Sequence, residues 1–487
     1  MVKNDLVNEF EKELIKKGIS RRDAIKLASL GSASFLMNPS EVQANTPLKA
    51  SEVQAKVVIV GGGLSGVSTA ARLANSLATP DITIIEPNMK SVSYQPGNTF
   101  LASGIYEKKD VIYNTEDFLP NDVKLINDKA VEFFPEENYL NLSNGEKINY
   151  DYLVVAAGLV LDFSKIKGLE EVGDIYTVED SPKYNKFFSK TGVSTMYNID
   201  GAVQTWKNMQ NLIEQAKNGI KQNAVFTHPN TAIKCGGAPK KIMYLMNSRL
   251  NEVSKKAREN VDMSFYANSS KMFSIKEYED AIIEQYKARD MNYNLNHNLV
   301  EVDLEKKIAV FDNFWEEKGA YDADLEEYDM ITKNKFIDVK YDFLHITPPM
   351  KAAPEIADSP IGSANGWVPV NKETLQHVKY KNIFSLGDIA AVPLGKTGGS
   401  VRKQYKVLVD NLISAMEGKE LKSKYDGYTV CPIITDIGKV MLAEFDWSMK
   451  PTPSFPLDPT QERYIWWLLK LYILKPLTQY GMLSGRA

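Results

Sequence analysis

Apolar residues follow two different periods along the chain, and the changes between them indicate alternating strands and helices. A β-branched run at 56–60 enters a cluster of glycines, and apolar residues at helical spacing follow it. Similar runs predict strands at 82–85, 123–126, 129–134, 139–142, 147–150, 150–158, 224–227 and 382–386, with helices over 202–217 and from about 239 to 250. This alternation is typical of an α/β protein with doubly wound sheets.

The first strand–turn–helix unit carries a dinucleotide-binding pattern. Gly61, Gly63 and Gly66 satisfy G-x-G-x-x-G between the strand and the helix. These glycines permit the turn, the approach of a pyrophosphate to the backbone, and close packing of helix on strand. Glu86 ends the second strand, twenty residues after Gly66, where a carboxylate can accept hydrogen bonds from an adenosine ribose. A glycine-rich turn alone is often an ordinary turn, but with both strands, the helix and Glu86 it predicts a dinucleotide site.

Several later stretches extend the predicted cofactor site. The loop 93–104 combines turn formers with aromatic residues, which suits either a planar ligand or a plain surface loop. Asp388 follows a buried strand and can bind the ribityl hydroxyls of a flavin, while Lys396 either faces the flavin pyrimidine edge or is a solvated loop lysine. The predicted cofactor contacts are Gly61, Gly63, Gly66, Glu86, Gln95, Val131, Ala157, Gly158, Gly387, Asp388, Lys396 and Thr397.

A second glycine fingerprint is missing after the strand at 224–227. A flavoprotein that takes hydride from a nicotinamide normally carries one at such a strand end, so its absence argues against a nicotinamide donor. The chain instead places Cys235 just before a helix that begins near Pro239. His228, seven residues before Cys235, is either a packing residue or a proton relay.

The chain contains two cysteines, Cys235 and Cys431. A helix N-terminus favours the thiolate form of Cys235, and Lys234 and Lys240 add positive charge. A single cysteine is most often a small core residue. Because Cys235 stands where a nucleotide motif is expected, we interpret the two cysteines as a redox pair.

Composition narrows the function classes further. The 487 residues carry a formal charge of −4, which gives no electrostatic reason to expect nucleic-acid binding. Two cysteines exclude a disulfide framework, and together with four scattered histidines they offer no metal-ligand spacing. We therefore predict no metal site and no nucleic-acid partner.

The first 44 residues have the pattern of an export signal. Arg21 and Arg22 precede a mildly apolar run at 27–37 and a small-residue cleavage pattern at 41–44. This predicts a twin-arginine signal and a mature protein outside the cytoplasmic membrane. The alternative is an amphipathic cytosolic helix with two incidental arginines.

The C-terminal stretch predicts a helix at a membrane surface. Residues 464–474 are apolar and aromatic, with lysine and arginine inside and beside them. Eleven residues are too few to span a bilayer, but these residue types are common at its interface. A dimer helix or a core helix stays open, because the apolar face extends nearly all round.

These residues resemble the sulfide:quinone oxidoreductases, close relatives of flavocytochrome c sulfide dehydrogenase, over nearly all of the mature chain. The matching segments are 61–66 with Glu86, 94–96, 233–245, 345–350, 372–377, 384–388, 428–432 and 442–446. The resemblance implies two Rossmann-like domains of the disulfide-reductase flavoprotein type and a membrane-associating C-terminal helix. The implied divisions are a signal at 1–44, an FAD-binding domain at 55–164 and 371–425, a second Rossmann-like domain at 165–370, and a C-terminal region at 426–487.

The resemblance also implies an activity. Cys235 and Cys431 would oxidise sulfide to sulfane sulfur, as a persulfide or polysulfide, and FAD would pass the electrons to a membrane quinone. A small nucleophile would accept the sulfur, and the enzyme would lie on the periplasmic face of the membrane, with a homo-oligomer left open. The implied quinone and membrane contacts are Ile346, Pro348, Phe445, Trp466 and Trp467.

Three other functions stay open at this point. One is the flavin subunit of a flavocytochrome c-type sulfide dehydrogenase, which passes electrons to a cytochrome. Another is a non-catalytic, membrane-bound sulfur carrier with a flavin fold. NADH dehydrogenase activity is disfavoured by the absent second glycine motif.

Overall fold

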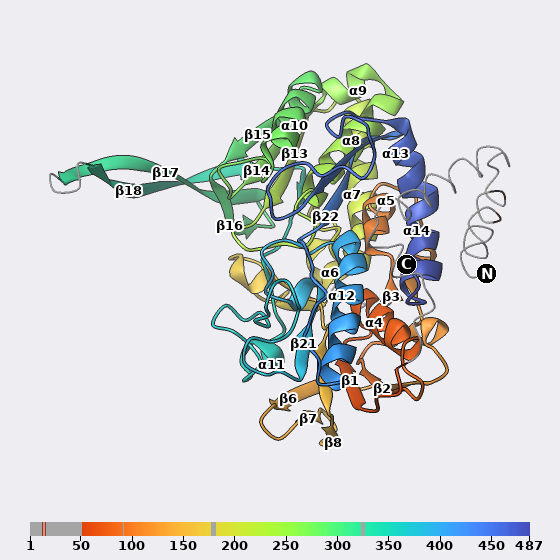
Figure 1. Ribbon diagram of the computed structural model, residues 1–487. Coiled ribbons are helices and arrows are strands. Elements are labelled where there is room, and N and C mark those ends of the chain that lie inside the picture. The colour runs from red at the N-terminus through yellow and green to blue at the C-terminus, as the bar shows by residue number, and fades with distance from the viewer. Residues whose placement is uncertain (1–11, 13–14, 16–50, 91, 177–181, 323–326) are drawn as a thin grey trace. The chain divides into compact units, whose positions relative to one another are not determined.

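A computed structural model describes residues 12, 15, 51–90, 92–176, 182–322 and 327–487 (Figure 1). The chain divides into two compact units. Unit 1 combines Met1–Gly97, Glu107–Val160 and Lys351–Ala487, and unit 2 combines Asn98–Tyr106 and Leu161–Met350. The twin-arginine signal predicted at 1–44 lies outside the described residues, apart from Lys12 and Ile15, and stays a prediction.

Unit 1 is built on a five-stranded parallel sheet of order β21-β9-β1-β2-β5. Four residues of the central strand β1 are buried, as its apolar run predicts. The strands of the sheet are β1 (Lys56–Val60), β2 (Asp81–Ile85), β5 (Val123–Ile126), β9 (Tyr152–Val155) and β21 (Ile383–Ser385). Helices α4 (Leu64–Ala74) and α12 (Gly398–Met416) pack against each other and against this sheet.

Smaller antiparallel elements complete unit 1. The strands are β3 (Val92–Ser93) with β4 (Ile112–Tyr113), β6 (Ala130–Phe134) with β7 (Tyr139–Leu142) and β8 (Lys147–Asn149), and β22 (Thr429–Asp436) with β23 (Lys439–Phe445). A short helix, α11 (Pro354–Ala357), packs on β6.

Unit 2 contains a second five-stranded parallel sheet, of order β12-β19-β13-β14-β15. Its strands are β12 (Val193–Ser194), β13 (Gln222–His228), β14 (Val261–Ala267), β15 (Asn292–Leu295) and β19 (Phe343–His345). The helices of the unit are α5 (Asn98–Leu101), α6 (Pro182–Phe188), α7 (Ile199–Lys217), α8 (Ala238–Val253), α9 (Lys255–Glu259) and α10 (Lys276–Ala288). Two parallel sheets with intervening helices confirm the predicted α/β class.

Two further sheets are smaller. One is an antiparallel sheet of β16 (His297–Asp303), β17 (Ile308–Asp322) and β18 (Glu327–Lys340). The other has the order β11-β10-β20, from strands β10 (Val160–Asp162), β11 (Asp174–Tyr176) and β20 (Met350–Lys351). The chain passes between the units after Gly97, Tyr106, Val160 and Met350, and the predicted domain limits at 164 and 370 stay predictions.

The C-terminal segment differs from the predicted surface helix. It runs from Tyr464 to Met482 as α13 (Tyr464–Leu468), a π-helical turn (Leu469–Ile473), α14 (Leu474–Pro476) and a second π-helical turn (Leu477–Met482). Trp466 and Trp467 are only 4% and 6% exposed, and the Trp466 ring lies 4.8 Å from the ring of Phe455. Both indoles are thus largely buried within the protein, and Leu477 and Met482 farther along belong to the core of unit 1. The membrane contact of this segment stays a prediction. Within the described part of the chain, no helix has the length and hydropathy needed to cross a membrane.

Candidate functional site

The glycine turn of unit 1 is closed around backbone atoms that leave no room for side chains. Gly61 has a φ of +111°, and a Cβ there would lie 2.5 Å from the carbonyl oxygen of Ala156. A Cβ on Gly66 would lie 1.9 Å from the carbonyl oxygen of Gly61. Gly63 caps α4 without a side-chain hydrogen bond, and the first turn of the helix carries no acidic residue. The N-terminus of α4 thus keeps the positive end of its dipole for an anion.

Glu86 is held at the edge of this turn. Its Oε2 accepts a hydrogen bond from the backbone N–H of Gly62 at 2.7 Å, and its Oε1 accepts one from the N–H of Asn88 at 2.8 Å. The residue is buried at the end of β2, the parallel neighbour of β1. A carboxylate in this place suits the ribose of a dinucleotide whose pyrophosphate lies at α4.

Two further segments approach the same turn. The Cα of Ala157 would lie 2.9 Å from a Cβ on Gly61, and Gly158 has a φ of +69° with open space where its Cβ would be. Gly387, after β21, has a φ of +75°, and its missing Cβ would lie 2.4 Å from Oγ of Ser65. The carboxyl ends of β1, β9 and β21 therefore meet at one edge of the sheet, where ligands of open α/β sheets bind. The close backbone packing at Gly61 and Gly66, the uncapped N-terminus of α4 and the carboxylate of Glu86 together fit a dinucleotide cofactor.

Lys396 lies in a low-dielectric setting within unit 1. Its Nζ donates to the carbonyl oxygens of Asp388 and, at 3.3 Å, of Ala390. The ammonium also stands 3.9 Å from the ring centroid of Trp367. Burial lowers the pKa of Lys396 to about 8, while the nearby charge of Asp388 raises it. The sequence predicts a lysine that faces the flavin; the structure gives it backbone carbonyl partners on the segment that follows β21.

The remaining predicted cofactor residues occupy different positions. Gln95 opens a short 3-10 helix that ends at Gly97. Val131 lies in β6 at a register irregularity between Ala130 and Glu132. Thr397 caps α12, where its Oγ1 accepts from the N–H of Ser400 at 3.2 Å. For Thr397 the observed role is structural.

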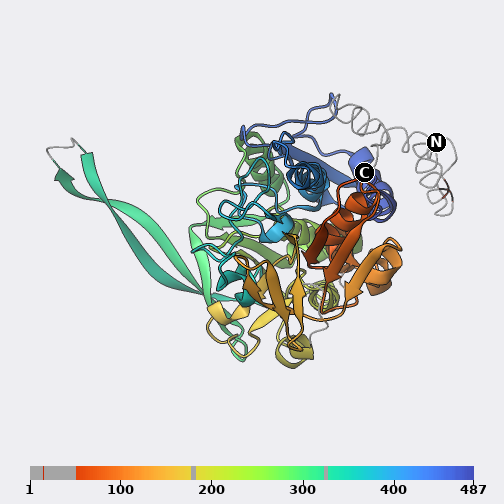
Figure 2. The same cartoon turned by 60° about the horizontal axis from the view of Figure 1, so that its bottom comes forward.

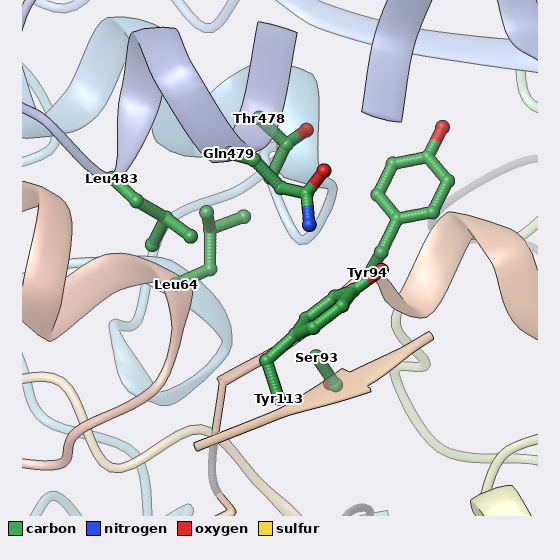
Figure 3. A pocket seen from close by; sticks show the side chains of 7 residues that line it. All are labelled: Leu64, Ser93, Tyr94, Tyr113, Thr478, Gln479 and Leu483. Atoms are coloured by element: carbon green, nitrogen blue, oxygen red, sulfur yellow. The ribbon is translucent and has the colours of Figure 1, made fainter. Parts of the chain in front are cut away.

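The C-terminal segment packs beside the glycine turn, which the sequence analysis does not predict. A shallow depression there is lined by Leu64, Ser93, Tyr94, Tyr113, Thr478, Gln479 and Leu483 (Figure 3). Leu64 is the first residue of α4, and the last three come from the end of the chain. The Nζ of Lys470, a residue only 1% exposed, also donates to the carbonyl oxygen of Pro96 at 3.2 Å. These contacts tie the end of the chain to the predicted cofactor loop.

Cys431 sits in the same unit, close to the start of α12. It is 3% exposed and pairs with Ala443 across β22 and β23. A Cβ on Gly399 would lie 2.1 Å from a methyl carbon of Val430, the residue before Cys431. Strand β22 therefore packs closely against the first turn of α12. The hydroxyl of Tyr428 also donates to Glu444 at 2.6 Å, which fixes the beginning of β22 to β23.

Cys235 occupies a strained turn in unit 2. Its φ of +52° lies in the left-handed region, which residues with a Cβ rarely adopt. The turn follows β13 and leads into α8, and the carbonyl oxygen of Cys235 accepts from the N–H of Ala238 at 2.7 Å. A strained backbone at a half-buried cysteine makes Cys235 a candidate functional residue.

Lysines of α8 surround this turn. The Nζ of Lys241 lies 3.3 Å from the Sγ of Cys235, and Lys241 is only 3% exposed. Lys240 donates to the carbonyl oxygen of Gly236 at 3.5 Å and lies 4.8 Å from the ring centroid of Phe265. Lys241 therefore supplies the charge that favours a thiolate at Cys235, a role that the sequence analysis gave to its neighbours. The sequence could have indicated Lys241, because it lies in the first turn of a helix that begins three residues after Cys235.

His228 and His345, the last residues of β13 and β19, are neutral imidazoles. Burial and, to a smaller extent, the charge of Lys240 lower the pKa of His228 to about 3. Burial also lowers the pKa of His345 to about 3, and its Nε2 accepts from the N–H of Met196 at 3.1 Å. Both imidazoles are neutral at pH 7 and therefore poor proton donors, which favours the packing interpretation of His228.

The predicted quinone contacts are divided between the units. Ile346 and Pro348 follow β19 in unit 2, and Phe445 ends β23 in unit 1. All three side chains are buried. The quinone contacts and the two cysteines are each divided between unit 1 and unit 2. A common quinone site and the pairing of the cysteines therefore both stay predictions.

Three comparisons place the chain among known proteins. Residues 55–191 match the family described as pyridine nucleotide-disulphide oxidoreductase. The mitochondrial sulfide:quinone oxidoreductase of Dictyostelium discoideum is 37% identical over 433 residues, 88% of this chain and 86% of that protein. The Mus musculus protein of the same name is 35% identical over 431 residues, with shares of 88% and 86%. The solved sulfide:quinone oxidoreductase of Aquifex aeolicus covers 89% of this chain and 92% of its own, with 20% identity and a TM-score of 0.69, which shows a common fold.

Proposed function

The chain belongs to the sulfide:quinone oxidoreductase family, and from this premise we propose how its residues oxidise sulfide and reduce a quinone. The protein is an FAD-dependent oxidoreductase. FAD, when bound, takes up an electron pair from one reactant and releases it to the other. The residues that would hold it are the glycine turn, with Glu86 at the ribose and Asp388 and Lys396 farther along the cofactor.

The sulfur chemistry rests on the two cysteines. In our proposal, HS⁻ attacks a Cys235–Cys431 disulfide, so that one S–S bond breaks, a persulfide forms on one cysteine, and a thiolate leaves on the other. A small nucleophile then takes the outer sulfur and returns the persulfide to a thiolate. When the two thiolates rejoin as a disulfide, two electrons leave the pair, which balances the two electrons lost by sulfide.

One observation carries this proposal: Cys235 stands in a strained turn with the ammonium of Lys241 3.3 Å from its sulfur. The charge lowers the cost of holding a thiolate, and the thiolate is the leaving group of the first step and the nucleophile of the last. A thiolate of lower pKa leaves a disulfide faster, so the lysine would speed the first step, and it would raise the thiolate fraction of Cys235 that attacks in the last. We assign Cys235 as the sulfur nearer the cofactor.

The proposed reduction of the quinone involves a membrane surface as well as the protein. The reaction needs contact with a bilayer, since quinones dissolve there, and we propose a peripheral enzyme on the periplasmic face. Residues such as Tyr464 and Tyr480, which are 62% and 43% exposed, replace the buried tryptophans as surface contacts of the C-terminal segment.

The test uses the purified flavoprotein with sulfide and decylquinone. We expect sulfide-dependent quinone reduction in the wild type and its loss in Cys235→Ser and Cys431→Ser. Lys255→Ala, which alters a lysine whose side chain is 90% exposed on α9, is the matched control and is expected to keep wild-type rates. Sulfide turnover at the wild-type rate by either cysteine variant would refute the redox pair.

A further inference from the structure

A long β-arm in unit 2 has no part in the proposed chemistry. Its strands β17 and β18 pair antiparallel from Ile308 with Lys340 to Asp322 with Glu327. Strand β16 covers the other edge of β17 only as far as Asn313, so beyond that point the arm has two strands. Figures 1 and 2 show this ribbon extending well away from the rest of unit 2. Two-stranded ribbons are at best marginally stable in water, so an additional strand would stabilise this one.

Among the described residues, no strand pairs with the outer edge of β18, which carries both apolar and charged side chains. All nine residues from 328 to 336 are exposed. Four of the twelve large apolar side chains that are exposed in the described part of the chain lie among them: Tyr328 (47%), Met330 (54%), Ile331 (45%) and Phe336 (67%). The strand has no proline, and the register irregularity of the arm falls opposite, between Lys318 and Tyr321 of β17. An exposed edge strand can accept another strand, and the edge lysines Lys333 and Lys335 restrict which strands it can accept.

The charges of β18 select its partner. Asp329 lies in the first half of the open stretch, and Lys333 and Lys335 lie in the second half. An antiparallel copy of the same strand brings each acidic half beside a basic half, whereas a parallel copy would oppose Asp329 to itself. We propose that two copies of this protein associate by antiparallel pairing of their β18 edges around a two-fold axis, which joins the two arms into a four-stranded ribbon.

A register centred on Thr332 uses these residues best. It places Asp329 opposite Lys335, Tyr328 opposite Phe336, and Thr332 opposite its own copy. Opposite charges, aromatic pairs and paired threonines are the cross-strand combinations that stabilise antiparallel sheets. The two-fold axis makes the first two pairs occur twice.

The free edge of β17 fits a second copy less well. Beyond Asn313, its exposed charged residues are Glu316, Glu317 and Lys318. Antiparallel self-pairing centred on Glu317 opposes the two Glu317 carboxylates directly, while Glu316 faces Lys318. The acidic excess of β17 therefore leaves β18 as the self-complementary edge.

The first test is the dissociation constant of full-length protein, measured by sedimentation equilibrium over a concentration series. We expect a monomer–dimer equilibrium that Asp329→Lys and Lys335→Asp each weaken by about tenfold. The double variant D329K/K335D restores the opposite charges and should recover wild-type association. D329K/K333D has the same net charge in another register and serves as the matched control, which stays weak.

The second test traps the contact covalently. Directly opposed residues of antiparallel strands lie within the Cα separation of a disulfide, so Thr332→Cys should give a covalent dimer on oxidation with diamide. Asn334→Cys faces Met330 of the other copy in this register and should cross-link poorly. A protein that is monomeric at all concentrations and gives no Thr332→Cys dimer, or a dimer that none of the arm variants weakens, overturns the proposal and leaves the arm to a different partner.

Discussion

Replacing Lys241 with methionine removes the positive charge beside Cys235 and keeps a side chain of similar length. The Nζ of Lys241 lies 3.3 Å from the Sγ of Cys235, and both residues belong to unit 2. At this separation, an ammonium and a thiolate attract each other by about 1 kcal/mol at the dielectric constant of water and by about 5 kcal/mol at an effective value near 20. Cys235 is half-buried, so the interaction lies between these limits. Since about 1.4 kcal/mol is tenfold in an equilibrium constant, we expect the thiolate population at neutral pH to fall by about tenfold or more.

The assay is the rate of alkylation of Cys235 by iodoacetamide in reduced protein, with Cys431→Ser as the common background. Only the thiolate reacts, so the rate reports the thiolate fraction. Lys240→Met is the matched control, because the ammonium of Lys240 binds the carbonyl oxygen of Gly236 and stacks on Phe265. We expect a clearly smaller loss of rate in this variant. Equal rates in the wild type and Lys241→Met, with unchanged far-UV circular dichroism, would refute the electrostatic role of Lys241.

Three further outcomes are expected. Gly66→Ala should lose flavin and about 2 kcal/mol or more of stability, because its Cβ would lie 1.9 Å from a backbone oxygen. Flavin absorbance and urea unfolding measure the two losses. Gly398→Ala, whose Cβ meets its nearest atom at 3.7 Å, should keep both the flavin and the stability. Burial lowers the pKa of Lys396 from 10.5 to about 8, so between these pH values the unfolded chain holds the extra proton and the folded state gains stability as the pH rises. The free energy of unfolding of wild type relative to Lys396→Met should therefore increase by about 1 kcal/mol for each pH unit in that window, and parallel pH profiles would contradict this. Replacing Tyr464 and Tyr480 with serine should reduce co-sedimentation with phospholipid vesicles while sulfide still reduces the flavin; unchanged vesicle binding would count against a surface contact here.

The sequence predicts the elements of the fold where hydrophobic pattern and turn chemistry agree. The strand at 123–126 is β5 without any change of limits, and the run at 56–60 is the central strand of the first sheet. The turn at Gly61 and the carboxylate of Glu86 follow from local sequence, because the motif specifies a strand, a tight turn and a helix within a few residues.

The rest depends on contacts that local sequence does not encode. The proximity of Lys241 to Cys235 requires the register between a loop and the first turn of α8. The burial of Trp466 and Trp467 depends on which surface lies beside α13, and an apolar helix suits a protein core as well as a bilayer. The β17–β18 arm was not predicted either, because strands without a buried face lack the alternation that marks strands elsewhere.

The turn at Cys235 combines a signal from the local sequence with a conformation that only the fold shows. A left-handed φ costs a residue with a Cβ about 1 kcal/mol or more, and glycine would occupy the same conformation without that cost. The next two residues, Gly236 and Gly237, are glycines that supply flexible backbone beside the cysteine. The chain thus keeps a sulfur at a position whose backbone suits glycine, at the end of the strand where a nucleotide motif of glycines is missing. The proposed reaction, which needs the sulfur at this place, would account for that combination, and this is the reason to measure the reactivity of Cys235 before that of any other residue.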